Sequence, residues 1–584
     1  MNEYNFFTPA RLTIFAACIF MLYFAGLGSV PLFDPDEPVY GEFVKEMVKT
    51  GDWTTPQFTG TIWYDKPPLF HWFASFAVTL LGPTELAIRL PSAIMATALS
   101  LLVFAWASFE LGSFGGILSA VVMATCIQQI VLARAAVTDV TLVFFLTLTV
   151  FAWRLGQSAD RRLTRIGWHI LAGAAAGLGM LTKGPVSLVL PGAAFFIFIF
   201  WKHDLFVAVR TLFSPETGIM LATALLTGLP WFIISWRLHP DAFYHDMILV
   251  NHIQRFLKPE HPEQTTAWYS HLMNIPVLLL FFFPWSIFLP QSLSDFWKHR
   301  KTHDGLVLAA IYGATVFVFF SISKTILVTY IFPMYPAVSL LTGSWLMSLT
   351  SSPALASSSA SPSSSASISE STSDSPSATT SISVSAIDKD AVPGSSGEYR
   401  LKWSLNAGLA MGVIFTLGLT VAAWNKFPEA IAAAPVCGVI LIAIFVTARR
   451  AIDTPASIPW AIAAGMVIFA LGLAYIVLPF AGQRGSTREI IAYLPSDARL
   501  AAFRLDRPSM PFIKTPSVIF YGPPGVINAS DASGIENFLR HTGASGPTFI
   551  ITRDSYTASL TQQFGVHEIA TLGGFGLTAF YPDK

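Results

Sequence analysis

Long apolar runs, separated by short polar segments, recur along most of this chain. A helix needs about 20 residues to cross roughly 30 Å of hydrocarbon, because each residue adds about 1.5 Å. Thirteen runs approach or exceed this length and predict an uncleaved first span followed by twelve further transmembrane helices, at 11–30, 88–109, 116–133, 138–154, 167–182, 185–201, 217–236, 275–291, 305–323, 326–348, 404–424, 430–448 and 458–479. The shorter apolar stretch 69–82 predicts a re-entrant or interfacial helix.

Basic residues collect in alternate loops between these runs. The loop 154–165 contains four arginines, and further basic residues fall in 202–210, 298–301 and 449–450. The first loop on the opposite side, 31–68, is instead rich in Asp and Glu. Because cytoplasmic loops carry an excess of Lys and Arg, we expect a cytoplasmic N-terminus and, after an odd number of spans, an extracytoplasmic C-terminal tail.

Two segments differ from the apolar runs. The Ser-rich stretch 351–400 predicts a disordered cytoplasmic linker between a transmembrane domain at 1–350 and further helices at 401–481. The stretch 482–584 has an ordinary composition and predicts a small extracytoplasmic α/β domain. In that domain we expect strands at 499–503, 517–521, 548–551 and 576–581, and helices at 487–494, 534–541 and 555–564.

Composition supports a polytopic α-helical membrane protein. Of 584 residues, 53% are hydrophobic and 12% are charged, whereas soluble proteins carry roughly 25% charged residues. The formal net charge is zero, so no overall field favours a nucleic-acid partner. The three cysteines, Cys18, Cys126 and Cys437, lie in apolar runs and indicate neither a disulfide framework nor a thiolate metal site.

Ionisable residues concentrate on the predicted outer side. Asp139, Lys183 and Lys324 stand at the edges of predicted spans, and His252 and Arg255 lie in the outer loop 237–274. Charges so close to hydrocarbon are costly, which makes them candidates for function. Taken singly, however, a lysine, arginine or histidine at this depth is more often an anchor at the interface than a ligand.

The first outer loop is the richest of these regions. Its residues 34–51 predict a helix in the interface plane, with Pro38 in its first turn, Gly51 at its end, and Asp36 and Glu37 at its positive N-terminus. Asp36 could equally serve only to cap that helix. Further on, aromatic residues and a double proline surround Lys66, which could meet a lipid phosphate or only extend its amine to the interface.

These residues form an ordered set of motifs that resembles a known family. The motifs are Asp36-Glu37, Tyr40, Met47, Asp52-Trp53, Asp65-Lys66-Pro67-Pro68-Leu69, Arg89-Leu90-Pro91-Ser92, Arg134 with Asp139, 181–185, 252–256, Pro284-Trp285, Ser323-Lys324 and 330–336. Over roughly 10–345 the chain resembles the dolichyl-phosphate-mannose–protein mannosyltransferase-like enzymes, and within them the bacterial lipid A aminoarabinose transferases.

The resemblance implies a GT-C glycosyltransferase fold in a bacterial inner membrane, with a polyprenyl-phosphate sugar as donor and a lipid or glycan acceptor at the outer face. It implies that the 1–350 domain is catalytic and that the terminal domain is periplasmic. The residues it implies are Asp36, Glu37 and Asp139 for catalysis, then Tyr40, Asp65, Lys66, Arg255, Lys324 and Tyr330 for the donor, with Tyr64, Lys183 and His252 in support.

Several alternatives remain open. Val39 stands where family members often carry Arg, and Asp65 replaces the commoner Glu, so a sugar other than aminoarabinose or an acceptor other than lipid A fits as well. Asp65 and His252 could bind a divalent cation, although their spacing does not decide it.

Other functions also remain open. Protein O-mannosylation would still be the reaction of a glycosyltransferase, with a protein as the acceptor. A transporter or flippase is the rival class, but transport sites lie near the midplane between repeats, and these charges cluster on one side. The terminal domain could help to bind the acceptor.

Overall fold

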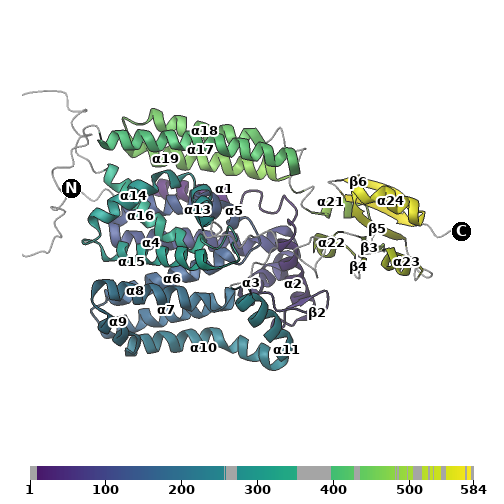
Figure 1. The fold of residues 1–584 in the computed structure, drawn as a ribbon, viewed down its shortest axis with the longest axis horizontal. Coiled ribbons are helices and arrows are strands. Elements are labelled where there is room, and N and C mark those ends of the chain that lie inside the picture. Colours follow the sequence, from purple (N-terminus) through teal and green to yellow (C-terminus); the bar gives the residue numbers. More distant parts are fainter. Residues whose placement is uncertain are drawn as a thin grey trace, which may run out of the picture.

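The computed structural model is mostly helical, with a small mixed sheet near the C-terminus (Figure 1). It describes residues 9–254, 257, 272–350, 396–426, 434–479, 482, 486–495, 497–503, 505, 516–523, 526–529, 532–540, 547–572 and 575–580. The predicted linker lies almost wholly outside these residues. Figure 1 shows the sheet and α2 (Asp36–Thr50) at one end of the helical bundle, with α9 (Leu205–Leu212) and α14 (Leu289–His299) at the opposite end.

The first half of the bundle contains the helices that most of the apolar runs predict. They are α1 (Pro9–Tyr23), α4 (Glu85–Thr125), α5 (Ile127–Ala133), α6 (Asp139–Gln157), α7 (Arg162–Lys183), α8 (Val186–Lys202) and α10 (Pro215–Leu238). The predicted spans 88–109 and 116–133 are joined in α4, but Gly112 interrupts its helical geometry with a φ of 78°. Glycine tolerates this left-handed region, so the chain changes direction there without steric cost.

Two later predictions need correction. The predicted span 275–291 is broken into α13 (Asn274–Phe281) and the pair η3 (Trp285–Phe288) and α14 (Leu289–His299), which are bent by 110°. Pro284 lies within the break and has no N–H to continue a helix. The predicted span 326–348 begins late, as α16 (Tyr335–Thr350), after the 3-10 turn η4 (Phe332–Met334).

The remaining membrane helices follow the sequence closely. They are α15 (Asp304–Ile322), α17 (Ser396–Lys426), α18 (Ala434–Arg450) and α19 (Ile458–Gly472), the last continuing as the π-helix η8 (Leu473–Val477). By length and composition, six helices among the described residues could cross a membrane, or seven when the bent pair counts as one span. The chain is therefore a multi-span membrane protein.

The first loop folds into α2 (Asp36–Thr50), a short hairpin of β1 (Gln57–Phe58) and β2 (Thr61–Ile62), and then α3 (Leu69–Leu81). The helix α2 ends at Gly51 in the left-handed conformation, as its sequence predicts. Its charged side chains differ in exposure, since Glu42 and Glu46 are buried whereas Lys49 is exposed. The helix lies between α3 and α22 of the C-terminal domain, so both of its sides are covered.

The C-terminal domain has a five-stranded sheet in the order β4-β3-β5-β7-β6. Its strands are β3 (Arg499–Phe503), β4 (Ile527–Ala529), β5 (Thr548–Arg553), β6 (His567–Leu572) and β7 (Phe575–Phe580). The helices are α21 (Arg488–Ile491), α22 (Pro516–Tyr521), α23 (Ala532–Arg540) and α24 (Asp554–Phe564). The predicted strand 517–521 is wrong, since this segment forms α22, and the sequence did not predict β4 or β6.

Candidate active site

A cavity of about 420 Å³ opens at the end of the bundle that carries α3 and the first loop. Asp139 begins α6 and Lys183 ends α7, so antiparallel packing of these helices brings both residues to that end. The cavity gathers six of the predicted site residues, namely Asp65, Lys66, Asp139, Lys183, His252 and Tyr330.

Two ion pairs line this cavity. Lys183 Nζ lies 2.8 Å from Asp139 Oδ1, and Lys66 Nζ lies 2.9 Å from Asp65 Oδ1. The four side chains are between 10% and 21% exposed, so a ligand in the cavity can reach them. The Lys183 ammonium also lies 5.6 Å from the centre of the Tyr330 ring, a cation–π contact. Two cations beside a phenol form a suitable environment for an anionic group such as a phosphate.

The backbone around Lys66 is fixed by its neighbours. Tyr64 is fully buried and packs edge-on against Trp231 and Phe243. The amide of Asn251 donates to the Tyr64 carbonyl at 3.4 Å and to the Asp246 carbonyl at 2.9 Å. Burial raises the pKa of the Tyr64 phenol. Tyr64 therefore supports the cavity from behind and does not line it.

His252 enters the cavity from the π-helix η1 (Phe243–Gln254). Its Nδ1 bonds to the Met247 carbonyl, and its Nε2 faces Gly184, where an added Cβ would lie only 2.1 Å away. Gly184 has a φ of 85°, which favours glycine. The turn after α7 thus needs glycine both for its own backbone and for the imidazole that packs on it.

The two adjacent carboxylates of α2 have different surroundings. Asp36 is exposed at the start of α2, and it does not line the cavity. Glu37 is buried, accepting two bonds from Arg89, at 2.7 and 2.6 Å, and one each from the amides of Phe33 and Ala136. Both oxygens of Glu37 are therefore occupied within the fold. These contacts favour a structural role for Glu37, and its role in catalysis stays a prediction.

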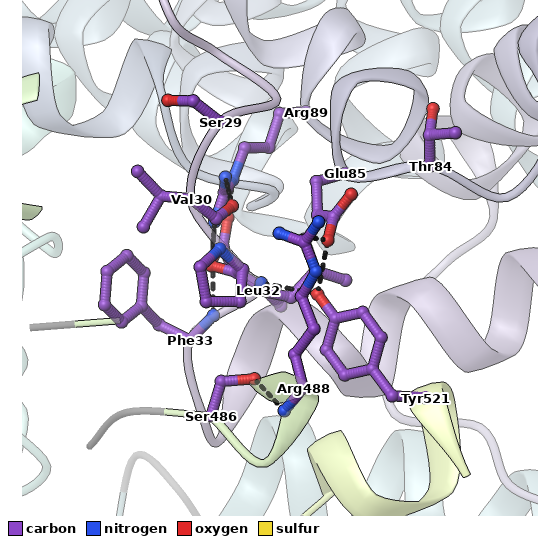
Figure 2. A network of polar contacts seen from close by, with 12 residues as sticks. Ser29, Val30, Leu32, Phe33, Thr84, Glu85, Arg89, Ser486, Arg488 and Tyr521 are labelled. Atoms are coloured by element: carbon purple, nitrogen blue, oxygen red, sulfur yellow. Dashed lines mark hydrogen bonds and ion pairs between the residues drawn. The ribbon is translucent and has the colours of Figure 1, made fainter. Parts of the chain in front are cut away.

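Arg89 extends the same network to the chain that leads out of α1. Its guanidinium also donates to the carbonyls of Leu27 and Pro31, and to that of Val30, which is labelled in Figure 2. A buried charge of this kind is stable only when its donors are satisfied. Glu37 and Arg89 together fix the start of the first loop relative to α4.

Two other predicted residues, Tyr40 and Lys324, do not line the cavity. Tyr40 is buried in the aromatic cluster beneath α2, against Phe70 and His71. Lys324 is exposed, and its neighbour Ser323 lines the cavity in its place. Arg255 lies outside the described residues.

Sequence reasoning assigned no role to the uncharged polar lining, which consists of Asn251, Ser323 and Thr329. Two of these had a usable signal, since Asn251 precedes His252 and Ser323 precedes Lys324 in the chain. Asp65 and His252 both line the cavity, but Asp65 already pairs with Lys66, and among the described residues no group of three or more His, Cys, Asp or Glu is placed to hold a metal ion. The part of the cavity wall that the structure describes therefore offers no set of three ligands for a metal ion.

Comparison with known proteins bears directly on this cavity. Residues 65–234 match the family model of the dolichyl-phosphate-mannose-protein mannosyltransferases. This segment is therefore similar to that family. It contains Asp65, Lys66, Asp139 and Lys183, so both ion pairs of the cavity fall within the region that these mannosyltransferases share.

Curated relatives extend the similarity beyond that segment. The undecaprenyl phosphate-alpha-4-amino-4-deoxy-L-arabinose arabinosyl transferase of Aeromonas hydrophila is 31% identical over 334 residues, which is 56% of this chain and 59% of that protein. The protein of the same name from an Enterobacter species is 30% identical over 339 residues, 57% of this chain and 59% of its own. The matched region thus spans about three fifths of each relative.

Solved structures support the same fold. ArnT from Cupriavidus metallidurans bound to undecaprenyl phosphate superposes with a TM-score of 0.74 at 19% identity, covering 98% of each chain. Its apo state gives 0.71 at 20% identity, also over 98% of each chain. The whole chain, including the C-terminal domain, therefore shares the fold of ArnT.

Proposed function

We propose that this protein is a membrane glycosyltransferase that moves a sugar from a polyprenyl-phosphate donor to an acceptor at the outer membrane face. The observation that carries the proposal is the cavity with Lys66, Lys183 and Tyr330 at its wall. Its charged pairs lie in a segment of the mannosyltransferase family. The relatives' names make undecaprenyl phosphate aminoarabinose the first donor to test. Lipid A is the first acceptor to test, because the motifs of the sequence resemble those of the lipid A aminoarabinose transferases.

The proposed topology has thirteen spans, a cytoplasmic N-terminus, a catalytic domain at 1–350, a linker at 351–400, helices at 401–481 and a periplasmic domain at 482–584, all in a bacterial inner membrane. Two features support it. The break at Gly112 divides α4 into two segments, and the basic turns next to α9 and α14 lie at the end of the bundle opposite the C-terminal domain (Figure 1).

The proposed mechanism follows from the negative charge that develops on the leaving phosphate. As the glycosidic bond breaks, negative charge grows on the departing phosphate, and preorganised cations and donors stabilise it there. Lys66, Lys183 and Tyr330 are placed for this role in the cavity, and we assign Arg255 to it from the sequence. Asp139 and Asp65 hold the two lysines in place and orient the sugar.

Asp36 is the proposed general base, which takes the proton from the acceptor as that oxygen bonds to the anomeric carbon and the phosphate departs. It is exposed at the N-terminus of α2, where an acceptor can approach it. A base of this kind contributes about 10²- to 10⁴-fold to the rate.

The test is transfer by purified protein in detergent, where turnover cannot be transport. Radiolabelled polyprenyl-phosphate sugars would be supplied in turn, beginning with aminoarabinose, and lipid A or membrane lipid extract would serve as acceptor. We expect Asp36→Asn to lower kcat by about two decades or more, and Lys66→Met to raise the KM for the donor. Lys49→Met, at an exposed lysine of α2, is the matched control. Absence of transfer with every donor would overturn the proposal.

A further inference from the structure

The C-terminal domain contacts the first loop through the short helix α22, which packs on α2. Phe520 is 6% exposed and lies in one apolar cluster with Tyr40 and Phe43. Its ring covers Gly41, where an added Cβ would lie 2.8 Å from a ring carbon. Lys45 Nζ donates to the Phe520 carbonyl at 3.1 Å. The two helices therefore fit closely, with no room for a side chain at residue 41.

Polar contacts from the same helix fix the chain that enters α2. The Tyr521 hydroxyl accepts from the Leu32 amide at 2.8 Å and donates to Glu85 Oε1 at 3.0 Å (Figure 2). Arg488 Nη1, from α21, lies 3.1 Å from the same Glu85 oxygen. Burial raises the pKa of the Tyr521 phenol, and the charge of Glu85 raises it further, so the hydroxyl keeps its proton and remains a donor.

Ser517 makes a second attachment to the first loop, at Asp34, two residues after Leu32. Its amide donates to Asp34 Oδ1 at 2.9 Å and its hydroxyl donates to Asp34 Oδ2 at 2.6 Å. The carboxylate thereby satisfies an N–H at the start of α22, as a capping residue would. The same hydroxyl accepts from the amide and hydroxyl of Thr487, so this attachment reaches into the interior of the C-terminal domain.

Residues 32–37 are thus held from two sides. The C-terminal domain fixes Leu32 and Asp34, while Arg89 of the membrane domain fixes Glu37. Asp36 lies between these attachments and begins α2. Its position relative to the cavity therefore depends on both domains.

We propose that α22 of the C-terminal domain positions Asp36 for transfer, with Tyr521 and Ser517 as positioning residues. This inference rests on the proposed function, in which Asp36 is the base. It assigns the domain a part in the chemical step, in contrast to a module that only binds the acceptor. Misplacing a reacting group by about 1 Å can cost about 100-fold in rate, so loss of these attachments should appear in kcat.

The experiment compares full-length wild type with Tyr521→Phe, Ser517→Ala and the double variant in the transfer assay. We expect kcat to fall about 10- to 100-fold in the double variant, with the KM values for donor and acceptor within twofold of wild type. Tyr493→Phe, at a 59% exposed tyrosine of the same domain, is the matched control. In the Asp36→Asn background, adding Tyr521→Phe should cost no further rate, because the positioned group is already lost.

A second measurement does not depend on activity. Hydrogen exchange of a peptide covering residues 30–40 should become faster in Tyr521→Phe, since the Leu32 amide loses its acceptor, while peptides of α6 keep their wild-type exchange. Unchanged kcat in the double variant, a rise in acceptor KM alone, or full additivity with Asp36→Asn would each overturn the inference. Absence of transfer by the wild type would instead overturn the proposed function, and this inference with it.

Discussion

Lys183 Nζ lies 2.8 Å from Asp139 Oδ1, so the last residue of α7 is paired with the first residue of α6 across the wall of the cavity. The pair places a cation beside Tyr330 without leaving its charge uncompensated in an apolar surrounding. The carboxylate and the ammonium should therefore act on transfer as one unit.

A double-mutant cycle tests that coupling. We expect Asp139→Asn and Lys183→Met each to lower kcat/KM for the donor. The kcat/KM of the double variant should be far higher than the value obtained by multiplying the two single losses. The coupling energy should fall between about 0.5 and 3 kcal/mol, as for residues in direct contact. Additive effects would show that the two side chains act independently in the reaction.

Substitutions at the neighbouring residues Asp36 and Glu37 should affect different properties, catalysis at Asp36 and stability at Glu37. Glu37→Gln leaves the Arg89 guanidinium without a charged partner in a buried site. Breaking such a pair costs about 3–5 kcal/mol, so we expect a clear fall in Tm and in yield. Asp36→Asn should keep the wild-type Tm and lose transfer. Thermal unfolding in detergent, measured together with kcat for both variants, distinguishes the two roles. Equal Tm values for wild type and Glu37→Gln would contradict the structural role of Glu37.

Gly184 offers a steric test of the cavity. Gly184→Ala forces a Cβ to within 2.1 Å of His252 Nε2 at a φ of 85°, so His252 must move. We expect a loss of about 1–3 kcal/mol in stability and a marked fall in kcat/KM. Gly192→Ala, in α8 where an added Cβ meets no atom within 4 Å, is the control. Adding His252→Ala to Gly184→Ala should recover part of the Tm, since the clash is gone while the backbone strain remains.

Glu42 gives a prediction on pH. Burial raises its pKa above the ordinary value of 4.5, and the charge of Lys45 only partly offsets this. The folded state therefore binds a proton that the unfolded state releases, and stability declines as pH rises from 4.5 to the folded-state pKa. Glu42→Gln should remove that part of the decline, so its Tm relative to wild type should improve with rising pH. Glu46→Gln is the control for loss of one negative charge on α2, and parallel Tm curves for wild type and Glu42→Gln would contradict the prediction.

The sequence predicts best those features that local chemistry determines. The limits of α2 follow from its carboxylates and Gly51, and β3, β5 and β7 follow from short apolar runs. Likewise, charges at the ends of apolar runs indicated Asp139 and Lys183, which the cavity brings together. In each case the residues that carry the sequence signal lie within one turn of the helix end, or within the strand, that they predict.

Features that depend on distant packing could not be predicted in this way. The aromatic and β-branched residues of 517–521 favour a strand, but Asp34 of the first loop caps this segment as a helix. Burial of Glu42 depends on the same distant contact. Asn251 and Thr329 carry no charge to mark them, and the π-helix that places Asn251 has no sequence signal that we used.

The attachment of Ser517 to Asp34 joins positions 483 residues apart. During synthesis the first loop is made long before α22. The apolar surface of α2 that Phe520 covers must therefore stay uncovered while the intervening helices are inserted. The contact between the first loop and α22 can therefore form only after the intervening helices are made. Chains truncated before residue 516 should insert these helices and still lack the cover that Phe520 gives to α2.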